Sequence, residues 1–394
     1  MWRVTYYSRE SIRKSITMIK GGRKIFSLKR IIGVITLITL LFFSDFIAGD
    51  KAILCVCKGN MTMPVFSENV RSQETDNCSF CLFPPIRYSP FQIDVNNGNY
   101  VSPFAQQNIP SVCFRHWLGT DKLGRDVAAG IVHGAGISLG IGLFATFLSL
   151  LLGVPLGIAL GYYQDNTIRW NVIQYFVFIV SVFFVLFYIS FLISSTSLVI
   201  LTFACLIFML ILYLLIRSIG KWNMTKYNVP FDLFGFRILE WRKSIPALFL
   251  LLALLSLFSK PSVYNVIIII ALLSWADIAR LIRAETLTIK NHLFVQSAIT
   301  MGFSHVYIIV HHIFPMLKGS LIVIAMYIMA GAVLMEATLS FLGLGLPVEE
   351  VSWGKLLAES RNARAWWMAV FPGGCLIMLL LFLHSKTKKI SGLY

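Results

Sequence analysis

Charged residues are scarce in this chain, and acidic residues are scarcer than basic ones. Only 13% of its 394 residues are charged and 57% are hydrophobic, whereas soluble domains carry about 25% charged residues. The composition therefore excludes a soluble globular enzyme. The 34 Lys and Arg residues outnumber the 18 Asp and Glu residues, which gives a formal net charge of +16. This excess fits either nucleic-acid binding or the basic cytoplasmic loops of a membrane protein.

Charges are nearly absent from a series of long apolar runs. At a rise of ~1.5 Å per residue, about 20 apolar residues cross a hydrocarbon core that is ~30 Å thick. We therefore predict an all-α polytopic membrane protein with about eight transmembrane helices. The predicted spans are 31–49, 136–162, 171–193, 198–216, 245–258, 263–282, 320–342 and 366–384. Residues 171–216 contain no charged residue and are too long for one span, so this run must turn.

Basic residues are concentrated in segments that one topology places on the same side. Residues 1–30 hold nine basic residues and one acidic residue, and further basic clusters lie at 217–243, at 283–318 and in the tail after 384. Counting spans places all four segments in the cytoplasm, together with both termini, as the positive-inside rule requires. Residues 50–133 then form an extracytoplasmic segment with seven basic and seven acidic residues. This distribution excludes nucleic acid as the partner that explains the net charge.

Five of the seven cysteines lie in the extracytoplasmic segment. They are Cys55, Cys57, Cys78, Cys81 and Cys113. The spacing of Cys78 and Cys81 also fits half of a zinc site, but no His residues follow at zinc-finger spacing. We favour a structural disulfide or free thiols over a metal site, because disulfides persist outside the cytoplasm. The odd number leaves at least one of these thiols unpaired.

Motifs for energy conversion are missing from the sequence. It contains no G-x-x-x-x-G-K-[ST], G-x-S-x-G or H-E-x-x-H motif, so we predict neither enzyme activity nor a cofactor. A transporter of this kind needs either a separate ATPase or an ion gradient, and ion-coupled carriers usually have carboxylates within their spans. Asp45, Asp277 and Glu336 are the candidates, and placement at the membrane interface is the alternative that we favour over an ion relay.

Glycine recurs at every fourth position in the predicted span 136–162. Gly153, Gly157 and Gly161 form a small-x-x-x-small face, which lets a second helix approach closely. Pro155 lies in the same span and predicts a kink, because it removes one backbone donor. We predict that the three glycines serve helix packing.

The inner segment 283–318 has the pattern of a surface helix followed by a turn. Apolar and small residues recur at helical spacing at Leu293, Phe294, Ser297, Ala298 and Met301. Gly302 predicts the end of this helix, and Ser304 can cap a second helix that enters the membrane near Pro315. Small exposed residues at Ser297, Ala298 and Gly302 favour the close approach of a protein over a helix that lies on lipid.

Three separated stretches of sequence carry a resemblance to a known family. They are HWLGTDKLGRDVAAGIVHGAGISLGIGLFATFLSLLLGVPLGIALGYY at 116–163, QSAITMGFSHVYIIVHHIFP at 296–315 and EATLSFLGLGLPVEEVSWGKLL at 336–357. Together they resemble the permease subunits of ATP-binding-cassette importers for dipeptides, oligopeptides and nickel, specifically the second (C-type) permease of each pair. The resemblance implies a permease domain at 134–394 with the six-helix core of a type I importer, to which 171–237 adds an inserted helical pair.

The same resemblance implies a function and a set of partners. The chain is then a permease subunit in a bacterial inner membrane, which forms the path for peptides or similar small solutes with a second homologous permease. Two cytoplasmic ATP-binding subunits hydrolyse ATP, and an extracytoplasmic solute-binding protein delivers the cargo. The alternatives are an ion-coupled secondary transporter or a channel that works without ATPases, and a membrane scaffold that transports nothing.

In that family a cytoplasmic loop forms the coupling helix that docks on the ATPase. The resemblance assigns this role to Gln296, Ser297, Ala298, Met301, Gly302 and Pro315. The acidic residue that the family usually has is Gln296 here, and the first alanine is Ser297. One charge-assisted contact, worth about 1.5–3 kcal/mol when well placed, is thereby lost. We expect weaker docking or a divergent ATPase.

Two further groups near the predicted outer face each have two interpretations. In the run GTDKLGRD, contact with cargo is the alternative to a structural i, i+4 pair between Asp121 and Arg125, which we favour. Trp353, Trp366 and Trp367 either contact the delivery protein or, as we favour, belong to an aromatic belt at the membrane interface.

Overall fold

The computed structural model of the chain describes residues 43–57, 60–66, 78–165, 169–171, 174, 208, 226–258, 260–361 and 365–391. The chain divides into two compact units, each built from several stretches of sequence. The first unit comprises Met1–Leu148, Leu252–Ala271 and Met326–Lys389. The second unit comprises Ser149–Leu251, Leu272–Ala325 and Ile390–Tyr394.

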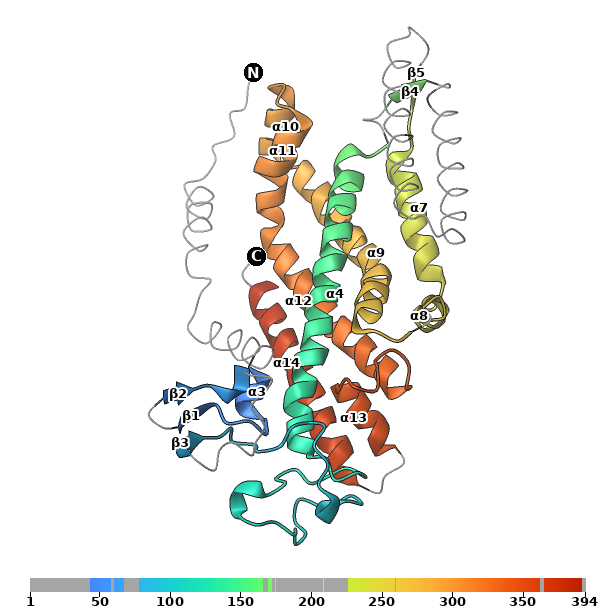
Figure 1. Cartoon of the computed structure of the whole chain (residues 1–394). Helices are drawn as coiled ribbons and strands as arrows, with labels where there is room; N and C mark the ends of the chain where they lie inside the picture. The colour runs from blue at the N-terminus through green and yellow to red at the C-terminus, as the bar shows by residue number, and fades with distance from the viewer. Residues whose placement is uncertain are drawn as a thin grey trace. The chain divides into compact units, whose positions relative to one another are not determined.

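Four helical runs among the described residues are long and apolar enough to cross a membrane. They are Val127–Tyr163, Val263–Lys290, His305–Phe341 and Trp366–Thr387. These runs are α4 (Val127–Tyr163), α9 (Val263–Lys290), the series α11 (His305–Ile308), η6 (Ile309–Ile313) and α12 (Phe314–Phe341), and α14 (Trp366–Ser391). Figure 1 labels the α-helices of this series. They confirm a mostly helical membrane protein. The predicted spans 171–193 and 198–216, apart from residues 171, 174 and 208, and most of 31–49 lie outside the described residues.

The structure corrects the prediction for the chain before α9. We predicted a basic loop up to 243 and a span at 245–258, but the structure has two helices, α7 (Phe231–Ser244) and α8 (Ala247–Leu255). They separate at Ile245, which is extended because the following Pro246 disfavours the helical conformation there. At nine residues, α8 is ~14 Å long, too short to cross the hydrocarbon core alone. The boundary predicted at 237 falls inside α7.

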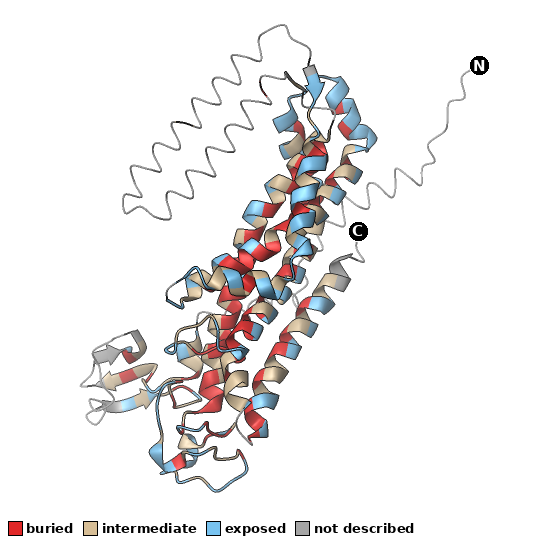
Figure 2. Cartoon of the chain, turned by 90° about the vertical axis from the view of Figure 1, so that its right-hand side faces the viewer, coloured by how far each residue is buried: buried red, intermediate tan, exposed pale blue. Residues whose placement is uncertain are grey.

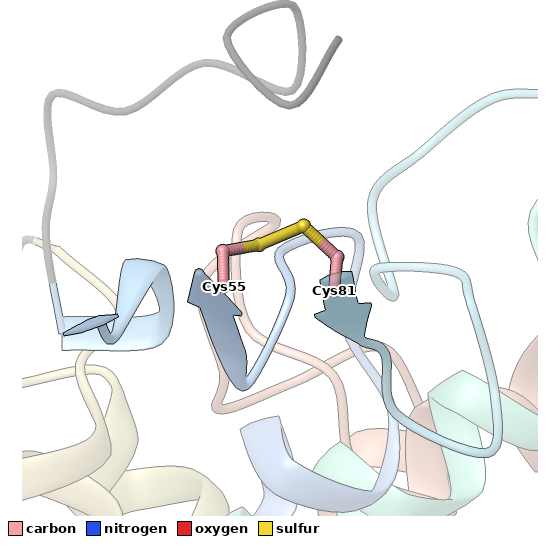
Figure 3. Close-up of a disulfide and its surroundings, with 2 residues drawn as sticks. All are labelled: Cys55 and Cys81. Atoms are coloured by element: carbon pink, nitrogen blue, oxygen red, sulfur yellow. A yellow bond between two sulfur atoms is a disulfide. The ribbon is translucent and has the colours of Figure 1, made fainter. Parts of the chain in front are cut away.

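The segment predicted to be extracytoplasmic contains a small antiparallel sheet that the all-α prediction did not include. Its strands are β1 (Leu54–Cys57), β2 (Asn60–Thr62) and β3 (Cys78–Leu82), in the order β2-β1-β3. Cys55 pairs with Cys81 in the register of β1 and β3, and a disulfide joins the two residues (Figure 3). The disulfide interpretation of these cysteines is therefore confirmed. Short helical elements complete the described segment at α3 (Ser44–Ile47), η2 (Pro64–Phe66), η4 (Val95–Asn97) and η5 (Val112–Phe114).

A second, two-stranded sheet joins the start of the predicted insertion 171–237 to a strand near its predicted end. The strands β4 (Arg169–Asn171) and β5 (Lys226–Asn228) are antiparallel, and Trp170 is paired with Tyr227. The chain at 169–171 therefore lies beside the chain at 226–228.

Each unit has its own apolar core. In the first unit, side chains of α4, α12, α13 (Trp353–Ser360) and α14 meet in one cluster, which consists of Ala135, Leu139, Val333, Ala337, Trp353, Leu376, Leu379 and Leu383. In the second unit, Leu160 of α4 packs with Leu239 of α7 and with Ala276 and Ala279 of α9. Figure 2 shows buried and exposed residues alternating along the helices, as expected where one face is packed on protein.

Candidate functional site

The predicted surface helix, glycine turn and serine cap are all present between α9 and α12. α10 (Leu293–Thr300) ends at Met301, and Gly302 has a φ of 79°, a conformation that side chains disfavour. The Ser304 hydroxyl then accepts a hydrogen bond from the Tyr307 backbone N–H at 3.3 Å and caps α11. We call residues 291–304, which join α9 to α11, the coupling segment.

Most of the residues predicted for ATPase coupling are exposed. Gln296, Ser297 and Gly302 are exposed, and Met301 is 68% exposed. A Cβ atom placed on Gly302 would meet nothing within 4 Å, so the turn is open to a partner. Pro315 is also exposed, in the first turn of α12.

Ala298 does not face outward as predicted. It is 2% exposed, and Val295 on the same helix is fully buried, so this side of α10 packs inward. The Ser297 hydroxyl donates to the Leu293 carbonyl at 2.8 Å, which satisfies it within its own helix. Gln296, Met301, Gly302 and Pro315 therefore remain as the groups of the prediction that are free to contact a partner.

Large apolar side chains on and beside the coupling segment are the feature that the sequence reasoning missed. Leu293 and Val306 are 74% and 67% exposed, and Phe303 is 45% exposed. Tyr307 stacks on both Phe303 and His311, with ring centroids 5.1 and 4.3 Å apart. Exposed apolar groups gathered in this way are typical of surfaces that contact another protein or lipid. Their helical spacing was visible in the sequence, but their exposure was not.

The glycine face of α4 lies directly on α9 in the second unit. A Cβ atom on Gly153 would lie 2.6 Å from the Trp275 carbonyl oxygen, and one on Gly157 would lie 2.6 Å from that of Ala279. One on Gly161 would lie 2.8 Å from the Arg283 carbonyl oxygen. Each four-residue step on α4 thus matches a four-residue step on α9. Only glycine permits this backbone approach over two helical turns.

Two sets of ion pairs hold α7 against α9. The Arg283 guanidinium donates to both carboxylate oxygens of Asp232 at 2.5 Å, and Arg242 donates to Asp277 at 2.8 Å. Arg280 also donates to Asp277, at 3.2 Å. Asp277 is therefore paired with two arginines, and its structural role is to hold α9 against α7.

Glu336 is a fully buried carboxylate in the first unit, and it therefore does not lie at a lipid interface. Its two oxygens accept hydrogen bonds from the hydroxyl groups of Ser138 on α4 and Ser340 on α12, each at 2.8 Å. The Ser138 hydroxyl in turn accepts from the Trp353 backbone N–H at 3.3 Å. The carboxylate thus joins α4, α12 and the start of α13. These bonds satisfy the buried polar group.

The predicted pair in the run GTDKLGRD is confirmed as structural. Asp121 accepts from the Arg125 side chain and from the backbone N–H groups of Leu123 and Arg125 at 2.8 Å. Arg125 also donates to Glu359 of α13 at 3.0 Å. Burial alone lowers the pKa of Arg125, but the attraction of Glu359 and Asp121 outweighs it and raises the pKa. The run fastens the entry of α4 to α13 in the first unit.

A buried histidine lies beside this run. His116 Nδ1 is 2.9 Å from Asp126 Oδ1 and Nε2 is 3.3 Å from Asp94 Oδ2, and the ring stacks on Tyr88 at 4.2 Å. Burial alone lowers the pKa of His116, but its bonds with Asp126 and Asp94 outweigh burial and raise the pKa. Burial and the same two carboxylates raise the pKa of Tyr88 to about 12. The second Asp126 oxygen accepts from the Ala129 backbone N–H at 2.7 Å and caps α4.

The tryptophans differ from both interpretations that the sequence suggested. Trp353 and Trp367 are buried, and their indole N–H groups donate to the Ile131 and Thr120 carbonyls at 2.9 and 3.2 Å. They serve the core of the first unit and not a belt or a docking site. Trp366 alone of the three is exposed, and Phe104 stacks on it with centroids 6.3 Å apart.

Comparison with known proteins identifies the domain that contains most of these features. Residues 218–385 match the family described as binding-protein-dependent transport system inner membrane component. This stretch, which is less than half of the chain, is similar to that family. The predicted resemblance to permeases of ATP-binding-cassette importers is thereby confirmed, and the chain is a multi-pass membrane permease.

Curated relatives extend the similarity of this permease beyond the domain. A dipeptide transport system permease protein of Alkalihalophilus pseudofirmus is 27% identical over 76% of this chain and 75% of its own. A peptidoglycan transport system permease protein of Agrobacterium fabrum is 25% identical over 89% of this chain and 86% of its own. A chain of an inward-facing methionine ABC transporter is 13% identical, with a TM-score of 0.45 over 68% of this chain and 98% of its own.

Proposed function

We propose that this permease is the transmembrane subunit of an ATP-driven importer of peptides or similar small solutes. It forms the translocation path with a second homologous permease. Two cytoplasmic ATP-binding subunits supply the energy, and an extracytoplasmic solute-binding protein delivers the cargo. The basic segments support a topology with both termini in the cytoplasm of a bacterium. The names of the relatives support peptides as cargo and give no support to nickel.

The exposed coupling segment is the observation that carries this proposal. It lies between two apolar helices, α9 and α12, and its turn at Gly302 is open. The exposed Leu293 and Met301 side chains offer apolar area that becomes buried when an ATP-binding subunit docks. Gln296 offers a neutral amide in place of a carboxylate, so apolar contact dominates this interface.

Ion coupling without ATPases is the rival function, and the two carboxylates in the described spans do not support it. Asp277 is paired with Arg242 and Arg280, and both oxygens of Glu336 accept from serine hydroxyls. A relay residue must release its proton or ion to water during each cycle. The contacts of both residues are those of structural links between helices.

The test compares two glycines that share one geometry but lie before and after the span that contains α12. Gly302 and Gly343 have φ angles of 79° and 77°, and a Cβ atom on either meets nothing within 4 Å. Gly302→Arg and Gly343→Arg therefore impose the same backbone strain, roughly 1–2 kcal/mol. We expect Gly302→Arg to abolish co-purification of the ATP-binding subunits and peptide-stimulated ATP hydrolysis, while Gly343→Arg retains both.

Two results contradict the proposal. One is uptake of peptide by this chain alone, in ATP-free vesicles that hold an ion gradient. The other is equal retention of the ATP-binding subunits by both arginine variants. The amount of each variant in the membrane, measured by immunoblot, separates a docking defect from a loss of folded protein.

A further inference from the structure

Tyr162 lies one residue before the end of α4, and contacts from both ends of the coupling segment meet on it. Lys290, the last residue of α9, donates from Nζ to the Tyr162 carbonyl at 2.6 Å. His305, the first residue of α11, places Nδ1 2.9 Å from the Tyr162 hydroxyl. The coupling segment, residues 291–304, is the chain between these two contacts.

The Lys290 contact follows from the geometry of a helix end. The last carbonyl groups of a helix have no partner within it, and a cation near this end is stabilised by the helix dipole. Lys290 bonds the Tyr162 carbonyl and also the Gln164 side-chain oxygen, at 3.2 Å. Its ammonium lies 5.5 Å from the centre of the Tyr162 ring, within the range of a cation–π contact.

The His305 contact depends on the tyrosine hydroxyl. Tyr162 is 2% exposed, and a buried tyrosine hydroxyl requires a hydrogen-bond partner. The two rings meet edge to face with centroids 5.7 Å apart, which orients the imidazole toward the hydroxyl. His305 also starts the capped helix that follows the Gly302 turn, so this bond fixes the far end of the coupling segment.

We propose that Tyr162 is the positioning residue that fastens the coupling segment to α4, so that movement of the segment on ATP binding is passed to the transmembrane helices. The inference rests on the proposed function. Movement of the coupling segment acts on α4 at Tyr162, one residue after Gly161. Gly161 belongs to the glycine face that packs on α9. Two helices in backbone contact move together, because close-packed interfaces transmit displacement instead of absorbing it.

The experiment removes only the hydroxyl from Tyr162. The permease, its partner permease and the ATP-binding subunits are purified as a complex and reconstituted in vesicles, and peptide taken up is measured per ATP hydrolysed. We expect Tyr162→Phe to assemble normally and hydrolyse ATP, but to lower uptake per ATP about two- to ten-fold, the range that one hydrogen bond supports. Tyr163→Phe is the control, because the Tyr163 ring also contacts His305, at 6.0 Å, without making this bond.

Variants of the histidine test the same bond from its other partner. Asn places a polar atom near the position of Nδ1, whereas Phe keeps the ring and loses the bond. We expect His305→Asn to retain most of the uptake per ATP and His305→Phe to resemble Tyr162→Phe. Wild-type uptake per ATP in Tyr162→Phe overturns the inference and leaves the proposed function standing.

Two other outcomes have distinct meanings. A fall in uptake that only follows the amount of intact complex, measured by size-exclusion chromatography, shows a structural role and overturns the inference. A wild-type complex that takes up peptide without hydrolysing ATP overturns the proposed function, and with it this inference.

Discussion

The carbonyl oxygen of Ala279 lies 2.6 Å from the position that a Cβ atom on Gly157 would occupy. No real Cβ contact is this short, so even alanine at this position forces α4 and α9 apart. We expect Gly157→Ala to destabilise the permease by about 1–3 kcal/mol, the usual cost of overpacking. The midpoint of thermal unfolding in detergent measures the effect.

Gly140 provides the control on the same helix. A Cβ atom there meets nothing within 4 Å, and alanine is the better helix former by about 0.5–1 kcal/mol. Gly140→Ala should therefore leave the midpoint unchanged or raise it. Equal losses at both positions would contradict the contact between α4 and α9.

The His116 cluster predicts that stability depends on pH. Because the folded pKa of His116 is raised above 6.5, its contribution to the free energy of unfolding is fully present below pH 6.5. It is lost as the pH rises through the folded pKa. The pKa of Asp94 is lowered from 3.8 because hydrogen bonds from Asn97 and His116 outweigh burial, so its contribution is present above pH 3.8 and lost as the pH falls through the folded value. Stability from this cluster is therefore greatest between these limits.

Unfolding midpoints measured from pH 4 to 9 test this dependence. We expect stability of the wild type to fall above pH 6.5 and His116→Gln to remove this fall. His133→Gln is the matched control, because His133 does not lie between two carboxylates as His116 does. It bonds the Ala48 carbonyl at 2.8 Å and lies 3.8 Å from an exposed Asp45. An unchanged pH profile in His116→Gln would show that the imidazole is not charged in the fold.

The ion pair between α7 and α9 predicts a partial rescue by charge exchange. Asp232→Arg or Arg283→Asp alone should cost about 1.5–3 kcal/mol, the range for a hydrogen bond to a charged group. The double exchange should recover part of this, though not all, because Asp232 lies at the amino-terminal end of α7, which favours an acid. A double-mutant cycle on unfolding free energies measures the coupling.

A second pair on α7 sets the baseline for that cycle. Arg237 and Glu240 are 3.5 Å apart, and their side chains are 65% and 46% exposed. Exposed pairs contribute about 0–1 kcal/mol, so exchanging these two charges should change little. If the cycle at Asp232 and Arg283 gives no more coupling than this, α7 is not held to α9 by its charges.

Local signals explain why the coupling segment was predicted so closely. Gly302 ends a helix because glycine tolerates a positive φ, and Ser304 begins one because its hydroxyl caps a backbone N–H. Both effects act within four residues, so the sequence contains them in full. The glycine face of α4 was predictable for a similar reason. Glycine at every fourth position of a span puts small residues on one face, which is typical of a face that packs on a second helix.

Long-range partners explain what the sequence did not reveal. The charges of α7 suggested a loop, because nothing local indicates that Asp232 and Arg242 meet Arg283 and Asp277 of α9. Ala298 was expected to face outward, since the faces of a short helix cannot be told apart without its neighbours. The buried tryptophans were misplaced because an indole suits both an interface and a core in which its N–H finds a carbonyl.

The length of α4 has a consequence for the lipids in which the permease works. Its 37 residues extend ~56 Å, whereas the hydrocarbon layer is ~30 Å thick. Some ten or more residues must stand in the headgroup regions or the water beyond them, unless strong tilt absorbs them. The tilt of such a helix is set by the helices that pack on it and not by the match between its length and the layer. Growth temperature and fatty-acid composition should therefore alter the packing of this permease less than that of a protein whose helices match the layer.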